Sequence, residues 1–154
     1  MERGLSMKRF LLLALLLACC SVSQAEIRRL VMVTATPELA EIRLSPRDIR
    51  KLYLGRAIIR NDRRLIPLIN RSDPLLYQIF LQKSVLMSSN SYERFLLAKV
   101  FRSGGSRPQR YDSLQQLIQA LLHRPHTVSY MWAVNARDEP RLRIITEIWR
   151  GNIR

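Results

Sequence analysis

The sequence predicts one α/β domain in which helices cover a mixed sheet, giving three layers. Stretches rich in β-branched residues alternate along the chain with stretches whose apolar residues recur at helical spacing. The chain has 154 residues, of which 47% are hydrophobic. This length suffices for one core and is short for two ordinary domains. No repeat or linker divides the chain, so residues 26–154 are expected to form a single domain.

Strand-like composition occurs four times, over residues 27–36, 65–70, 127–134 and 142–149. The first stretch ends at Pro37, and Pro67 lies near the start of the second, where a missing N–H is tolerated. Helices separate the first three stretches, whereas the last two follow each other. This β-α-β-α-α-α-β-β order predicts a sheet that contains both parallel and antiparallel pairs.

Helices are predicted from Ser45 to Gly55, from Asp73 to about Leu86, from Tyr92 to Phe101 and over residues 114–123. In the first helix Ser45 can act as the cap, Pro46 suits the first position, and Asp48 can complete a capping box. Gly55 suits the left-handed backbone conformation that often ends a helix. Residues 102–111 are expected to be a basic loop.

Residues 1–25 have the features of a secretory signal peptide. A charged start precedes the apolar run 10–18 and the small residues Ser23 and Ala25, after which cleavage is expected. The run is too short to span a bilayer, which needs about 20 residues. Translation from Met1 or from Met7 keeps all these features. We therefore expect a periplasmic protein with no stable membrane span.

Both cysteines of the chain lie in this predicted signal peptide. Residues 16–19, Leu-Leu-Ala-Cys, approximate a lipobox, so lipid attachment to Cys19 is the alternative to ordinary cleavage. Leucine is unusual at the middle position of a lipobox, and this favours cleavage after Ala25. A chain cleaved there has no disulfide, no thiol nucleophile and no cysteine ligand for a metal.

The chain is strongly basic, with 26 Lys and Arg against 12 Asp and Glu, a net charge of +14. Three basic residues and one acidic residue leave with the signal peptide, so the exported chain keeps +12. The arginines form no single block, and an exported protein rarely meets genomic DNA, so we expect no nucleic-acid partner. The charge points to small anions, anionic polymers or an anionic membrane surface.

Four segments, in order, carry a resemblance to a known family. Residues 44–55 contain Leu-Ser-Pro-Arg-Asp-Ile and then Tyr-Leu-Gly, and residues 73–86 carry Phe80 and then Val-Leu. Residues 100–108 read Val-Phe-Arg-Ser-Gly-Gly-Ser-Arg-Pro, and residues 114–130 complete the set. Together they resemble small periplasmic proteins related to the phosphate-binding component of ABC transporters, in the type 2 periplasmic binding protein superfamily. The resemblance implies one lobe of such a protein and a small, phosphate-like oxyanion as ligand.

The resemblance implies an oxyanion site where Arg71 and Ser72 precede the second predicted helix. A guanidinium and a hydroxyl near a helix start can hold an oxyanion. The alternative is that Arg71 pairs with Asp73 or is solvated and that Ser72 is a turn residue. Family members carry Ser-Gly-Thr at this place, whereas here Asp73 brings a negative charge and Pro74 has no N–H to donate. We therefore expect weak or lost phosphate binding.

Two further places can contact an oxyanion. Ser45 offers a hydroxyl at a helix start, with helix capping as the alternative role. Gly104 and Gly105 can expose N–H groups as an anion nest, or can form a flexible connection. Their loop lacks the Lys-Ser/Thr of a nucleotide-binding P-loop, so we expect no nucleotide.

Motifs of catalytic or metal chemistry are missing from the sequence. There is no Gly-x-Ser-x-Gly and no His-Glu-x-x-His. Pro125 separates His123 from His126 and breaks a common helical face, so we expect no metal site. The expected protein is non-enzymatic and without a cofactor, and its partner is a small oxyanion, a transporter or another envelope protein. The alternative is an envelope protein-interaction module that has lost ligand binding.

Overall fold

The computed structural model describes residues 27–152 and shows a mixed α/β fold around a five-stranded sheet. The strand order is β5-β4-β6-β1-β7. These strands are β1 (Ile27–Thr34), β4 (Ile66–Asn70), β5 (Gln109–Tyr111), β6 (Thr127–Trp132) and β7 (Arg143–Asn152). β4 runs parallel to β5 and β6, whereas β1 is antiparallel to β6 and β7. The prediction of an α/β domain with a mixed sheet is therefore confirmed. The predicted signal peptide and Cys19 lie outside the described residues.

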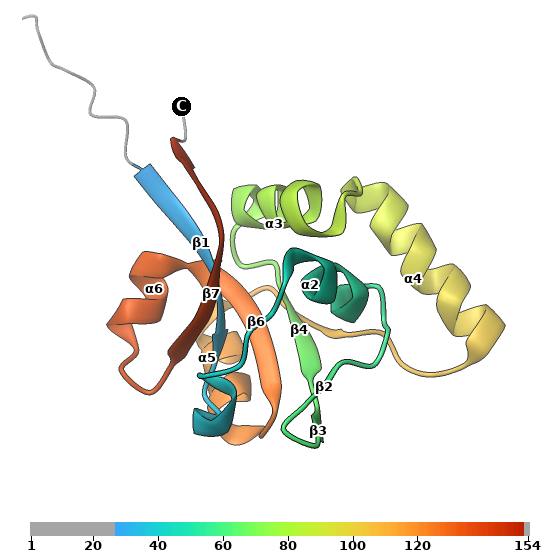
Figure 1. Ribbon diagram of the computed structural model, residues 1–154. Helices are drawn as coiled ribbons and strands as arrows, with labels where there is room; N and C mark the ends of the chain where they lie inside the picture. The colour runs from blue at the N-terminus through green and yellow to red at the C-terminus, as the bar shows by residue number, and fades with distance from the viewer. Residues whose placement is uncertain (1–26, 153–154) are drawn as a thin grey trace, which may run out of the picture.

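Helices cover both faces of this sheet (Figure 1). They are η1 (Pro37–Leu39), α2 (Pro46–Tyr53), α3 (Pro74–Phe80), η2 (Leu81–Val85), α4 (Ser89–Ser103), α5 (Leu114–His123) and α6 (Ala133–Asp138). A short hairpin of β2 (Ile59–Arg60) and β3 (Arg63–Arg64) follows α2. None of the helices in residues 27–152 has the length and apolar character needed to cross a membrane.

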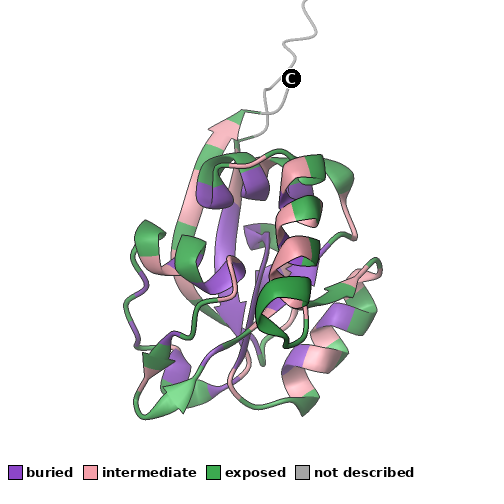
Figure 2. Ribbon diagram, turned by 90° about the vertical axis from the view of Figure 1, so that its right-hand side faces the viewer, coloured by how far each residue is buried: buried purple, intermediate pink, exposed green. Residues whose placement is uncertain are grey.

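Alternate side chains of β1 enter two separate cores, as the period of a strand requires. Leu30 and Met32 pack with α2, α3 and α4, whereas Val31 and Val33 pack with α5 and α6. Figure 2 shows the buried residues along the central strands and the exposed residues on the outer sides of the helices. The sheet is therefore the middle one of three layers.

The larger core is organised around three aromatic rings. Phe80 stacks on Tyr130, with ring centroids 3.5 Å apart and planes inclined by 6°, and Tyr53 meets both rings edge-on. The buried hydroxyl of Tyr53 donates to the Leu68 carbonyl at 3.1 Å, and that of Tyr130 donates to the Asn70 carbonyl at 2.9 Å. These bonds attach the aromatic cluster to β4.

The four longest helices, α2, α3, α4 and α5, begin at side-chain caps, and two of these caps, Ser45 and Asp73, are predicted helix starts. Ser45 and Asp48 form the predicted capping box of α2, and Ser113 caps α5. The predicted bounds of α5 agree with the structure. The helix predicted from Tyr92 starts earlier, at Ser89, because the Ser88 hydroxyl accepts the N–H of Ser91.

Several elements were not predicted from the sequence. β5 lies inside the predicted basic loop, and the strand predicted to end at Val134 stops at Trp132, where α6 begins without a linker. η1 and the β2–β3 hairpin were also missed. The last strand continues to Asn152 because β1 pairs with it over its whole length, from Ile27 opposite Asn152 onward.

Pro67 is accommodated as the second residue of β4. Its partner on β6 is Val128, and pairing with β5 starts one residue later, where Leu68 lies opposite Gln109. The neighbouring N–H of Ile66 bonds the His126 carbonyl on the β6 side at 2.9 Å. Successive N–H groups point to opposite sides of a strand. The N–H that Pro67 lacks would therefore point to the β5 side, at a position before β5 begins.

Candidate functional site

The residues expected to hold an oxyanion after β4 are engaged in contacts within the protein. The side chain of Asn70 is buried, and its Nδ2 donates to the Tyr130 carbonyl at 2.9 Å. Its Oδ1 accepts bonds from the N–H and the hydroxyl of Ser72, at 3.0 and 2.7 Å. Ser72 therefore stabilises the turn that follows β4, which is the alternative role considered for it.

Asp73 occupies the position that an anion would take at the start of α3. Its Oδ1 accepts the N–H groups of Leu75 and Leu76 at 2.8 and 3.2 Å, and its Oδ2 accepts the indole N–H of Trp132 at 2.8 Å. Burial raises the pKa of Asp73, but these hydrogen bonds and the charge of Arg28 together outweigh burial, and the pKa lies below its ordinary value. The carboxylate therefore stays ionised near neutral pH and supplies the negative charge that α3 attracts.

Arg71 lies beside the same turn but does not pair with Asp73. Its Nε is 3.4 Å from Oδ1 of Asp112, and its guanidinium lies 5.8 Å from the ring centre of Tyr77. The Arg71 side chain is 40% exposed and that of Asp112 is 80% exposed. An exposed pair of this kind is weak, so Arg71 remains accessible to an anion from solvent.

Ser45 lies at the start of α2 and is part of its cap. Its hydroxyl accepts the N–H of Asp48 at 3.1 Å and also donates to Oδ2 of Asp48 at 2.9 Å. The same carboxylate oxygen lies 2.9 Å from Arg60. Helix capping therefore engages the Ser45 hydroxyl.

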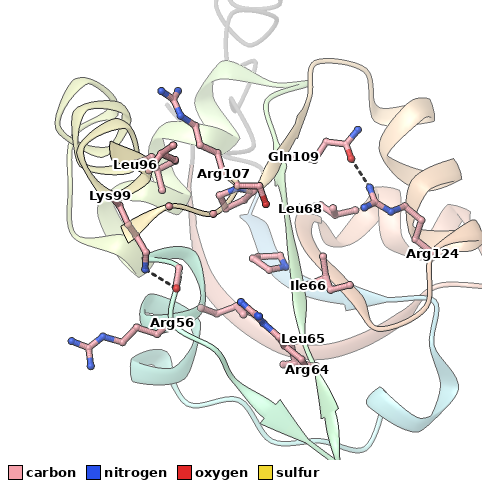
Figure 3. A pocket seen from close by; sticks show the side chains of 18 residues that line it. Arg56, Arg64, Leu65, Ile66, Leu68, Leu96, Lys99, Arg107, Gln109 and Arg124 are labelled. Atoms are coloured by element: carbon pink, nitrogen blue, oxygen red, sulfur yellow. Dashed lines mark hydrogen bonds between the residues drawn. The ribbon is translucent and has the colours of Figure 1, made fainter. Parts of the chain in front are cut away.

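A cavity of about 670 Å³ lies elsewhere, between α2, β4, α4 and the loop that leads to β5 (Figure 3). Of the five residues predicted to contact an oxyanion, Gly104 and Gly105 line it, whereas Arg71, Ser72 and Ser45 do not. Its lining contains no carboxylate and five cations, namely Arg56, Arg64, Lys99, Arg107 and Arg124. The structure therefore assembles a basic cavity apart from the expected site.

Two of the five cations are held by polar atoms that carry no full negative charge. The ammonium group of Lys99 donates to the carbonyls of Leu54 and Gly55 at 3.0 and 2.6 Å, which stabilises the C-terminal end of α2. The guanidinium of Arg124 donates to the side-chain carbonyl of Gln109, as the dashed line in Figure 3 shows. Neither group forms an ion pair with a carboxylate within residues 27–152.

Arg107 has an acidic neighbour outside the lining. Its Nη1 is 3.8 Å from Oε2 of Glu93, and the same oxygen lies 3.1 Å from Arg110. One carboxylate is thus shared by two guanidinium groups. The charge of Arg107 is only partly offset.

The cavity was not predicted from the sequence beyond its two glycines. Arg56 follows α2, Arg64 ends β3, Lys99 lies within α4 and Arg124 follows α5. The basic loop around Gly104 and Gly105 was the one signal available, because the other cations come from segments far apart in the chain. The packing of the helices on the sheet brings these cations together.

The two histidines lie at the end of α5 and in the turn that leads to β6. His123 is the last residue of α5, and its Nδ1 contacts the Gln119 carbonyl at 2.8 Å. His126 has a positive φ of 62°, and its buried Nδ1 has no hydrogen-bond partner in the structure. Within residues 27–152, no three side chains of His, Cys, Asp or Glu gather so that they could hold a metal ion.

Comparisons of the chain with protein-family models, with curated proteins and with solved structures give no match.

Proposed function

We propose that this chain is an exported, non-enzymatic protein that resembles one lobe of a periplasmic phosphate-binding protein and that binds phosphate weakly or not at all at the start of α3. The observation that carries the proposal is the position of Asp73. Its carboxylate accepts the two N–H groups, of Leu75 and Leu76, that an oxyanion would need there.

Two further contacts support this proposal. The indole of Trp132 holds Oδ2 of Asp73, so displacing the carboxylate would also break a bond to β6. Pro74 occupies the first position of α3 and has no N–H to offer. An incoming phosphate would meet a fixed negative charge, and like charges at such short range repel.

Isothermal titration of the full chain with phosphate and sulfate tests the proposal. We expect no binding tighter than millimolar at the start of α3. Submicromolar phosphate binding that disappears in Arg71→Gln would contradict the proposal, because Arg71 is an accessible cation beside that turn. Arg137→Gln, which removes an exposed arginine on α6, is the matched control.

The second candidate function is an envelope protein-interaction module that has lost ligand binding. The observation that favours it is the exposed apolar surface of α4, where Phe101 is 81% and Leu97 is 43% exposed. Arg94 and Arg102 are exposed on the same helix. Apolar and cationic side chains next to each other suit a partner with an acidic and apolar surface.

A pull-down from envelope fractions tests this second candidate. Wild-type protein is expected to retain a protein partner at low salt and to release it as the salt concentration rises. Phe101→Ser should retain less of that partner, and Ile144→Ser, at another exposed apolar residue on β7, is the matched control. Equal retention by both variants would contradict a docking role for α4.

A further inference from the structure

The basic cavity lies at the opposite end of β4 from the expected oxyanion site. Ile66 and Gln109, the first residues of β4 and β5, line it, and Arg124 lies three residues before β6 starts. Arg71 and Ser72 instead follow the last residue of β4. Since the two places are separated by the length of the strand, the cavity is a different site.

The positive charge of the cavity favours an anionic ligand. Arg56 and Arg64 form no ion pair within residues 27–152, and no carboxylate lines the cavity. Lys99 uses two of its three N–H donors on backbone carbonyls and keeps the third. Guanidinium groups match the shape of carboxylate and phosphate groups and can bind them through two bonds.

The lining also contains an apolar surface that a bare oxyanion would leave uncovered. Ile66 is 39% exposed, and Pro67, Val100 and Pro108 are half-buried. Four buried leucines also line the cavity, namely Leu52, Leu65, Leu68 and Leu96. Apolar surface of this kind gains free energy when a ligand removes it from water.

The volume indicates the size of the occupant. At about 670 Å³ the cavity lies within the range of about 300–1,000 Å³ typical of sites for small organic molecules. A phosphate ion would fill a small part of it. A bilayer or a folded partner would contact the exposed arginines without filling the hollow.

We propose that this cavity binds a small amphipathic anion. Its carboxylate or phosphate group pairs with Arg64 and Arg56, and its apolar body covers Ile66, Pro67 and Val100. Gly105, whose φ is 93°, adds an N–H that has no acceptor within the described part of the chain. This inference goes beyond the proposed function and does not depend on it, because it concerns different residues.

Isothermal titration of the full chain with three probes tests the inference: octyl phosphate below its micellar concentration, inorganic phosphate and octan-1-ol. Octyl phosphate is expected to bind at least tenfold more tightly than either of the other two, because only octyl phosphate satisfies both the cations and the apolar lining. Its affinity should fall as salt is added.

Matched variants locate the binding. Arg56→Gln/Arg64→Gln is expected to weaken octyl phosphate binding at least tenfold. Arg137→Gln/Arg143→Gln lowers the net charge equally at exposed residues outside the cavity and should leave the affinity unchanged. All four arginines are exposed. Thermal denaturation of each variant verifies that it folds.

Three results would overturn the inference. The first is no octyl phosphate binding up to 1 mM, or binding no tighter than that of inorganic phosphate. The second is an equal loss of affinity in the two double variants, which would mean that net charge alone attracts the probe. The third is binding to phosphatidylglycerol vesicles without binding of soluble octyl phosphate, which would assign the cations to a membrane surface.

Discussion

The indole Nε1 of Trp132 donates a hydrogen bond of 2.8 Å to Oδ2 of Asp73, and so the end of β6 is joined to the start of α3. The other carboxylate oxygen caps the helix. The side chain that caps α3 therefore also connects this helix to Trp132, which lies 59 residues further along the chain. The Asp73 carboxylate therefore both occupies the start of α3 and stabilises the contact between α3 and β6.

Asp73→Ala should destabilise the protein by about 1–3 kcal/mol, because it removes a helix cap and leaves the buried indole N–H of Trp132 unpaired. Asp73→Asn keeps an acceptor for the cap and should cost less. Chemical denaturation measures both values. Asp112→Ala, at an 80% exposed side chain, is the control and should stay within about 0.5 kcal/mol of wild type. An equal cost for Asp73→Ala and Asp112→Ala would refute this stabilising role.

Stability should decline in acid partly through Asp73. The pKa of Asp73 in the folded protein lies below its ordinary value of 3.8, so the unfolded chain binds a proton more readily than the folded one. Its stabilising contribution is complete above pH 3.8 and is lost as the pH falls through the lower, folded value. Asp73→Asn should therefore lose less stability between pH 5 and pH 2 than wild type. Parallel pH profiles would contradict this assignment.

Phe80→Ala should destabilise the protein by about 3–5 kcal/mol, because it empties the centre of the larger core and removes the stacking on Tyr130. Phe101→Ala removes the same side chain from a position that is 81% exposed and should change the free energy of unfolding by less than about 0.5 kcal/mol. Urea denaturation of the two variants provides the comparison. A cost for Phe80→Ala below 1 kcal/mol would contradict the described core.

Gly55→Ala should be costly for two separable reasons. Its φ of +76° disfavours any residue with a Cβ by about 1–2 kcal/mol, and the new Cβ would lie 2.7 Å from the Nζ of Lys99. The ammonium group would have to leave the carbonyls of Leu54 and Gly55. A double-mutant cycle with Lys99→Ala separates the two contributions, because the φ penalty is present in both backgrounds.

In that cycle Gly55→Ala should cost at least about 0.5 kcal/mol more in wild type than in the Lys99→Ala background. The measurement is the free energy of unfolding of the four proteins in denaturant. If the cost is the same in both backgrounds, the contact between Lys99 and the end of α2 does not contribute to stability.

Local patterns predicted most of the helices and strands of this chain. α5 agrees with its predicted bounds because Ser113 caps it and its apolar residues recur at helical spacing. The caps Ser45 and Asp73 likewise mark the starts of α2 and α3. β5 was missed because its residues, Gln-Arg-Tyr, show no alternation, and they become a strand through pairing with β4.

The candidate site was predicted less completely. Asp73 starts a helix as predicted, and Ser72 precedes it in the turn after β4. The partners that engage them are Asn70 and Trp132, and the ion pair of Arg71 is with Asp112. Trp132 lies far away in the chain, so no local spacing indicates its bond to Asp73.

Residues within a few positions of one another are enough to predict the α/β class, the capped helix starts and the negative charge at α3. Only the folded chain shows that the indole of Trp132 holds Asp73 and that Arg64, Lys99 and Arg124 meet around one cavity. These contacts depend on the strand order β5-β4-β6-β1-β7 and on the packing of α2 and α4. The strand order and the helix packing bring together side chains that are far apart in the chain. Their distance in space cannot be predicted from their separation in the sequence.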